Sequence, residues 1–352
     1  MTSATIRPLL PGALAILLER LADDLDARRV SPAKVRAINA LLQALPPQRF
    51  GDIDRQIRET ARLYHYRRVP ASQFISFLHR LNGGGSAREG HDLALLRTNN
   101  ALAPIFLGHA NGRVREAALD HLDVGNSPYL VCALALRLND WAGPVRHAAM
   151  DCAERALPPV DPKTLATAAW ELLPRRASWA RGSGDAFVVL DAALTRPDVV
   201  RQIVEQAISQ PTGKGMQVVA ELSRHPAIDP FLPTLMQKAV QPGIRAMAAR
   251  FLIDGFASWP DGWSVKAGHA FGETRRVRQY GRRPLTTVAP PAETIHAAAH
   301  DRSFVVRATA ADGLVRHRSI LPDPRSLAEL IARDPHAAVR QRAEFVLAEL
   351  GD

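Results

Sequence analysis

A two-residue pattern recurs through the last two-thirds of this 352-residue chain and constrains its fold more than any other feature. In each copy a valine or isoleucine is followed by arginine, and these arginines are Arg115, Arg146, Arg245, Arg307 and Arg340. They are separated by 31, 99, 62 and 33 residues, so each spacing is one, two or three times a period of about 32 residues. Periods of this length are typical of proteins built from stacked helix pairs.

A stripe of small apolar residues accompanies the pattern. Alanine lies four residues after the aliphatic residue in every copy, and an apolar residue lies eight residues after it, as in Val114, Ala118 and Leu122. Positions with these spacings share one face of an α-helix. Because alanine is small, the stripe predicts helices that approach their neighbours closely, so that stacking supplies the hydrophobic core.

An aspartate precedes the arginine by six residues in three copies, as Asp140, Asp301 and Asp334. An aspartate at this point is suited to cap the following helix and to interact with its positive end. It also lies close enough in sequence to pair with an arginine in the first turns of that helix. We therefore expect a ladder of structural arginines, each bridging the aspartate of its own repeat and the backbone of a neighbouring repeat.

The combined pattern Asp-x4-Val-Arg-x3-Ala resembles HEAT repeats, and NDWAGPVRHAAM, DRSFVVRATAA and DPHAAVRQRAE are its closest copies. The resemblance covers roughly residues 100 to 352. It implies an all-α fold, an α-solenoid of antiparallel helix pairs in which the Val-Arg helix lines the concave side. Proteins of this family bind other proteins, nucleic acids and occasionally small substrates, so the resemblance indicates no single activity.

The first ninety residues are helical in pattern but lack the Val-Arg signature. Residues 82–90 (NGGGSAREG) have the composition of a flexible loop. We therefore expect an N-terminal helical region at 1–90 and a repeat region at 91–352. Within them the pattern predicts N-terminal helices opening at Pro32 and near 52–66 and 71–81, and helix pairs near 101–109/112–122, 128–138/143–157, 162–173/184–195, 197–209/214–224, 229–240/242–256, 291–300/303–316 and 324–333/336–350.

A basic insertion at 259–290 interrupts the repeats. Five arginines fall within nine of its residues, and with a lysine and a tyrosine they form the candidate binding set: Lys266, Arg275, Arg276, Arg278, Tyr280, Arg282 and Arg283. Guanidinium groups neutralise phosphates, and aromatic rings stack on unpaired bases. Because Gly268, Gly272 and Gly281 argue against a helix, we expect a mobile arm that binds nucleic acid or an acidic partner. The alternative is a solvated loop whose arginines pair with carboxylates on neighbouring repeats.

Several other classes of chemistry find little support. His296 and His300 are four residues apart, but the intervening glutamate of a metalloprotease helix and a fourth ligand are missing, so we expect no metal site. No phosphate-binding loop, dinucleotide fingerprint or serine-hydrolase elbow is complete, and we expect no cofactor. Two cysteines, Cys132 and Cys152, cannot form a disulfide framework, so we expect small buried hydrophobes and a cytoplasmic protein. No apolar run approaches the roughly 18 residues of a membrane span.

The function expected first is a non-catalytic scaffold that binds a protein partner along the concave face. The second is nucleic-acid binding through the insertion, which fits a chain with 45 basic and 35 acidic residues and a net charge of +10. A third follows from HEAT-like DNA glycosylases for alkylated bases, which use tryptophans and an acidic residue on the concave face. The residues available here for that chemistry are Trp141, Trp170 and Trp179 with Asp151 or Asp185.

Overall fold

The computed structural model describes residues 9–64, 87–179, 184–267, 274–287 and 289–351. These residues are predominantly α-helical and separate by their contacts into two compact units. Unit 1 comprises Met1–Leu172 and Trp179–Leu194, and unit 2 comprises Leu173–Ser178 and Thr195–Asp352. The boundary predicted near residue 90 falls inside unit 1, and most of the segment 82–90 lies outside the described residues, so the division at 90 stays a prediction.

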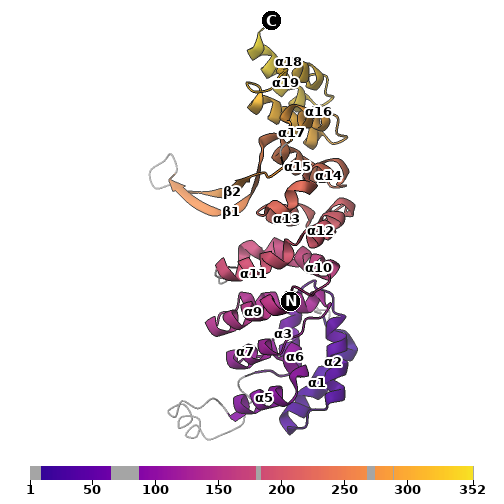
Figure 1. The fold of residues 1–352 in the computed structure, drawn as a ribbon, viewed down its shortest axis with the longest axis vertical. Helices are drawn as coiled ribbons and strands as arrows, with labels where there is room; N and C mark the ends of the chain where they lie inside the picture. The colour runs from indigo at the N-terminus through magenta and orange to yellow at the C-terminus, as the bar shows by residue number, and fades with distance from the viewer. Residues whose placement is uncertain (1–8, 65–86, 180–183, 268–273, 288, 352) are drawn as a thin grey trace, which may run out of the picture. The chain divides into compact units, whose positions relative to one another are not determined.

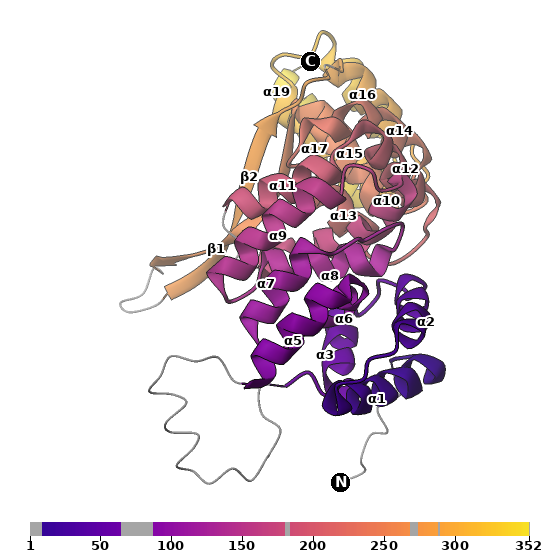
Figure 2. The same ribbon diagram turned by 60° about the horizontal axis from the view of Figure 1, so that its bottom comes forward.

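Unit 1 begins with three helices, of which the first packs on the other two. Helices α2 and α3 both contact α8, while α5, α7, α9 and α11 contact one another in succession; Figure 2 shows these four helices following one after another. The elements are α1 (Gly12–Ala27), α2 (Pro32–Gln43), α3 (Phe50–Thr60), α5 (Ala87–Thr98), η1 (Asn100–Leu102), α6 (Ala103–Phe106), α7 (Gly112–Asp120), α8 (Pro128–Leu138), α9 (Gly143–Ala156), α10 (Pro162–Leu172) and α11 (Gly184–Leu194).

Unit 2 continues with helix pairs and contains one β-hairpin. Its second helices α13, α15, α17 and α19 again contact one another in succession. The elements are η2 (Leu173–Ser178), α12 (Pro197–Ser209), α13 (Gly215–Leu222), η3 (Pro226–Phe231), α14 (Leu232–Lys238), α15 (Pro242–Asp254), β1 (Phe256–Ala267), β2 (Thr274–Pro284), α16 (Pro291–Ala299), α17 (Phe304–His317), α18 (Pro324–Ile331) and α19 (Ala337–Leu350).

Proline explains why the helices of the predicted pairs begin where they do. It occupies the first position of α8, α12, α15 and α18 among others, where its missing N–H costs no hydrogen bond and its fixed φ suits the helix. The observed bounds match the predicted pairs to within a few residues, and α8 coincides with the predicted 128–138. The N-terminal helix predicted at 71–81 lies outside the described residues.

The alanine stripe forms the core, as predicted. The repeat alanines Ala118, Ala149, Ala248, Ala310 and Ala343 are fully buried, and so are their aliphatic partners four residues earlier. Both cysteines are also buried, Cys132 in α8 and Cys152 in α9, and burial raises the pKa of Cys152 to about 11. At these positions the helices therefore pack through small and aliphatic side chains.

The five repeat arginines share one set of backbone contacts. In all five copies a terminal nitrogen donates to the carbonyl oxygens five and six residues earlier, in the turn that precedes its helix. Arg245, for example, donates to the oxygens of Ala239 and Val240 at 2.7 and 3.0 Å. Each arginine thus closes the turn before its own helix and supplies a donor to two carbonyl oxygens that lie outside that helix.

Three of the arginines also bind an aspartate, but it belongs to the next copy of the repeat. Bidentate pairs join Arg115 to Asp140, Arg245 to Asp301 and Arg307 to Asp334. This pairing reverses the expectation from the sequence, which assigned the aspartate to the same repeat and the backbone to its neighbour. The physical reason is that the turn carbonyls occupy the near side of the guanidinium, which leaves its outer edge facing the adjacent turn.

Each aspartate completes the link by holding its own turn. One oxygen of Asp140, Asp301 and Asp334 accepts a hydrogen bond from the backbone N–H two residues later, at 2.7 to 3.0 Å. Those N–H groups belong to the residues that precede the helices, so the aspartates brace the entry turns and do not cap the helices directly as expected. The hydrogen bond from Arg307 lowers the pKa of Asp334, which matches a carboxylate held in its charged form.

No helix in the described ranges has both the length and the apolar character to cross a membrane.

Candidate nucleic-acid interface

The basic insertion is a β-hairpin, which corrects the all-α expectation for this segment. β1 and β2 pair antiparallel from Phe256↔Pro284 to Ala267↔Thr274. Gly255 ends α15 with φ +71° and starts the hairpin, and its carbonyl accepts the N–H of Leu285 at 3.0 Å, which closes the base. The residue types fit, because β1 contains phenylalanine, tryptophan and valine and β2 contains threonine, valine and tyrosine, all of which favour strands.

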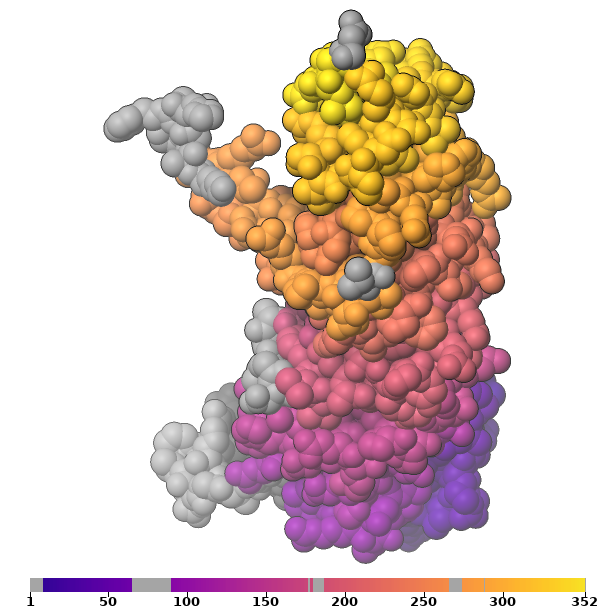
Figure 3. All heavy atoms as spheres, turned by 45° about the horizontal axis from the view of Figure 1, so that its top comes forward, coloured from indigo at the N-terminus to yellow at the C-terminus, as the bar shows by residue number. Residues whose placement is uncertain are grey.

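An irregularity in β1 lets the hairpin tolerate a proline. The register shifts between Pro260 and Trp263, and Gly262 within this bulge has φ +85°. Proline lacks an N–H for the ladder, so bulges are among the few places where a strand accepts it. Figures 1 and 3 show the hairpin extending away from the helices of unit 2 as an arm.

One face of the hairpin base is fixed to the helices. Arg283 donates to both oxygens of Asp229 at 2.6 and 2.9 Å and to the carbonyls of Ser223 and His225. Asp229 is fully buried; burial by itself raises its pKa, but hydrogen bonds from Arg283 and Thr286 outweigh that and hold the pKa below its usual value. Arg283, predicted as a binding residue, is therefore an anchor whose donors are already used.

A second anchor lies beside the first on the same face. The Arg224 guanidinium lies 5.3 Å from the Trp259 ring centroid and donates to Glu221, Asp261 and the carbonyl of Pro260. The indole covers Gly281 on the opposite strand, where a Cβ atom would lie only 2.4 Å from the Trp259 Nε1. Gly281 therefore provides space for the tryptophan that anchors the hairpin.

The other face is exposed and basic. Side chains alternate between the faces of a strand, so Arg276, Arg278, Tyr280 and Arg282 of β2 share a face with Trp263 of β1; these five residues are called the arginine face. Tyr280 is 62% exposed and Trp263 is 57% exposed. Arg276 and Arg278 lie 5.5 and 5.6 Å from the Trp263 centroid, and Arg282 lies 5.8 Å from that of Phe256.

The arginine face carries uncompensated charge. In the described part of the chain, neither its three arginines nor Arg275 forms an ion pair with a carboxylate, and β2 contains no acidic residue. The alternative of a loop neutralised by neighbouring carboxylates therefore holds for Arg283 alone. Arg275 lies on the opposite face, paired in register with Lys266, whose side chain lies outside the described residues.

A groove runs between the arginine face and the helices. Its volume is about 320 Å³, and Arg278 and Tyr280 line it from the hairpin. Met216 of α13 and Met247 and Arg250 of α15 line it from the helices. Methionine adapts its shape to flat apolar ligands, and a second exposed arginine adds positive charge. The groove thus presents both a ring-binding surface and a charge for an anion.

The residues expected for base excision have separate surroundings. Trp141 is 69% exposed in the turn before α9, whereas Trp170 is buried in α10. Trp179 stacks on Phe187 of α11, Asp151 is exposed on α9, and the side chain of Asp185 lies outside the described residues. Trp170 therefore packs in the core and cannot form a wall for a base.

The two histidines downstream of the insertion, His296 and His300, lie next to each other. His296 lies in the last turn of α16 and His300 directly follows the helix; their rings are tilted with centroids 4.7 Å apart, and the His300 Nδ1 contacts the His296 carbonyl oxygen. Among the residues that the structure describes, no group of three or more His, Cys, Asp or Glu side chains is arranged to hold a metal ion.

Sequence reasoning missed the partners that make the hairpin a fixed arm. Asp229 and Arg224 lie 54 and 37 residues from the groups they bind, and no local pattern links them.

Comparison of the sequence with protein-family models and with curated proteins finds no match.

Proposed function

We propose that the chain is a non-catalytic nucleic-acid-binding protein, and that the arginine face of the hairpin is its principal contact. The helix pairs and the arginine ladder support the resemblance to HEAT repeats, with the repeats acting as the scaffold that carries the hairpin. Of the two binding functions expected from the sequence, this one is favoured by the charge distribution, since a protein groove would not require four unpaired arginines on one arm.

The proposal rests on strand β2, which contains no acidic residue. Its arginines at 275, 276, 278 and 282 form no ion pair in the described residues, while the pair between Arg283 and Asp229 anchors the base of the hairpin. Unpaired guanidinium groups replace the counterions of a phosphate backbone, which drives binding by counterion release. Because the base is fixed through Arg283, the arginine face is presented with little loss of conformational entropy on binding.

The aromatic residues favour single strands over duplex. Trp263 and Tyr280 expose their rings on the same face as the arginines, and every unpaired base offers a ring on which they can stack. The methionine-lined groove beside Tyr280 offers a further apolar surface for a base. A duplex hides its bases, so only the charge contribution would remain for it.

The test is fluorescence anisotropy with a labelled single-stranded oligonucleotide of about 20 nucleotides, titrated between about 50 and 200 mM salt. The variant replaces Arg275, Arg276, Arg278 and Arg282 with serine and leaves Arg283 in place, because that residue holds the fold. We expect a loss of affinity of about 100-fold at low salt, and a salt slope that falls by roughly three for four lost phosphate contacts.

The matched control removes the same charge elsewhere: Arg36, Arg201, Arg302 and Arg333, all exposed, are replaced with serine. It should bind nearly as well as the unchanged protein, and duplex of the same length should bind more weakly than the single strand. Equal affinity of the hairpin variant and the unchanged protein would overturn the proposal. Binding of poly-glutamate but of no oligonucleotide would also overturn it, in favour of an acidic protein partner.

A further inference from the structure

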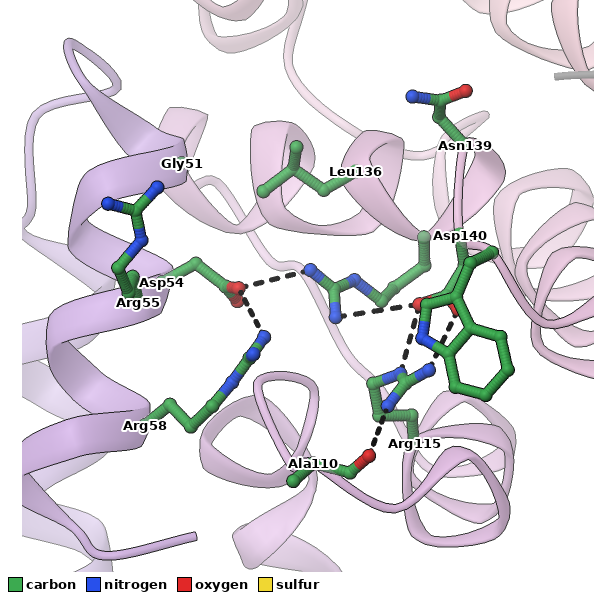
Figure 4. Close-up of a pocket in the computed structure, with 11 residues that line it drawn as sticks. Gly51, Asp54, Arg55, Arg58, Ala110, Arg115, Leu136, Asn139 and Asp140 are labelled. Carbon is green, nitrogen blue, oxygen red and sulfur yellow. Dashed lines mark hydrogen bonds and ion pairs between the residues drawn. The ribbon is translucent and has the colours of Figure 1, made fainter. Parts of the chain in front are cut away.

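A second polar cavity lies within unit 1, away from the hairpin. Its volume is about 500 Å³, which is in the range of small-molecule sites. It lies between α3, the end of α8 and the turns that precede α7 and α9. Figure 4 shows Asp54 and Arg58 of α3 meeting on one side of the cavity, and Arg115 with Asp140 on the other.

The floor of the cavity is a buried network of alternating charge. Arg115 pairs with Asp140 at 2.8 Å, and Arg137 pairs with Asp54 at 3.1 Å and approaches Asp140 at 3.7 Å. All four residues are more than nine-tenths buried. Two arginines and two aspartates balance, so the floor is neutral and its side chains are held in place by their mutual bonds.

The excess charge lies on α3. Arg58 is about one-third exposed and directed into the network by Gly108, whose carbonyl accepts its Nε, and by Asp54 at 3.5 Å. Arg55, one turn earlier, is exposed and forms no ion pair in the described part of unit 1. The cavity therefore has four guanidinium groups against two carboxylates, and the two in excess share one wall. This wall is suited to a phosphate group.

A flat apolar surface completes the cavity. Trp141 lines it with its indole 69% exposed, and the Arg115 guanidinium lies 5.8 Å from the ring centroid. The buried guanidinium holds the ring from one side, and the exposed surface remains available for a planar ligand. The exposed indole therefore gives the cavity a flat surface on which a planar ring can stack.

We infer that this cavity binds a nucleotide, with its phosphate on Arg55 and Arg58 and its base stacked on Trp141. The nucleotide is either a free mononucleotide or an unpaired nucleotide of a bound strand, and only the second source rests on the proposed function. Neither source requires a chemical step.

The experiment is calorimetric titration of the full chain with adenosine 5′-monophosphate, adenosine and inorganic phosphate as separate probes. We expect the monophosphate to bind at least tenfold more tightly than either of the others, because only it reaches both the wall and the ring. Arg55→Gln and Trp141→Ala should each weaken it about tenfold. Both side chains are exposed, so folding is preserved, and Arg36→Gln on α2 serves as the control.

The hairpin variant separates this inference from the proposed function. Serine at positions 275, 276, 278 and 282 should leave the affinity for the monophosphate unchanged. If the monophosphate does not bind but Arg55→Gln and Trp141→Ala weaken oligonucleotide binding about tenfold, the ligand is a nucleotide of the strand. If neither variant changes the affinity for any of these probes, the inference is wrong, whatever the hairpin binds.

Discussion

Arginine has different roles in the ladder of repeat arginines and in the hairpin. In the ladder, Arg115 and Arg245 are buried, at 3% and 2% exposure, and their guanidinium groups donate hydrogen bonds to an aspartate and to backbone carbonyls. On the hairpin, Arg276 and Arg278 are exposed, lie over the Trp263 ring and form no ion pair in the described residues. The difference shows that residue type alone does not identify a binding site; a ladder arginine has carboxylate or carbonyl partners within the chain, whereas the hairpin arginines Arg276 and Arg278 form no ion pair in the described residues.

The largest effect should come from removing a ladder arginine. Arg245→Met leaves Asp301 without its bidentate partner in a mostly buried setting, and we expect a loss of about 3–5 kcal/mol in the free energy of unfolding. Arg340→Met is the control, because in the described residues it binds two turn carbonyls and no carboxylate, and it should cost about 1 kcal/mol. Urea unfolding measures both, and equal losses would contradict the structural role of the inter-repeat pair.

The second-largest effect on stability should distinguish two adjacent hairpin residues, Arg282 and Arg283. Arg283→Met strips the fully buried Asp229 of its paired charge and should cost about 3 kcal/mol. Arg282→Met on the exposed face should change stability by less than about 0.5 kcal/mol. Urea unfolding again measures the difference, and similar values for the two variants would mean that the hairpin base is not anchored as described.

A smaller effect is expected where the anchoring indole covers glycine. Gly281→Ala places a methyl group against Trp259, so the ring or the strand must shift, at about 1–2 kcal/mol. Gly90→Ala in α5 has open space and should instead stabilise by about 0.5 kcal/mol. Thermal unfolding distinguishes the two signs, and a neutral Gly281→Ala variant would show that Trp259 is not held against the strand.

The smallest effect concerns pH. The pKa values of Asp229, Asp301 and Asp334 are lowered, so the folded chain binds fewer protons than the unfolded chain below about pH 5. Stability is therefore fully present above the ordinary aspartate pKa of about 4 and is lost as the pH falls through the lowered values. Arginine keeps its charge throughout, so binding to the hairpin should stay constant from about pH 6 to 9.

Asp334→Asn should reduce the acid-side loss in urea midpoints, whereas Glu344→Gln, at an exposed position on α19, should not. If the urea midpoint of Asp334→Asn fell with pH as steeply as that of the unchanged protein, the pairing of charged Asp334 with Arg307 would not contribute to stability.

Local patterns were sufficient for the helices and insufficient for the sites. The alanine stripe and the prolines at first helical positions place the pairs, because both act within a few residues. The hairpin was missed because its strands are polar and interrupted by Pro260 and Gly262, so no apolar alternation marks them. Its stability depends on Asp229, which is 54 residues from Arg283.

The printed residues alone establish a period of helix pairs and an excess of arginine, since helix formation and net charge depend on neighbouring residues and on composition. The tertiary structure decides which arginines form ion pairs within the chain. Asp54 meets Arg137 across 83 residues and Asp301 meets Arg245 across 56, with the hairpin lying between them. Such distant pairings leave no mark in sequence spacing, because a buried charge responds only to the partners that packing brings within a few ångströms.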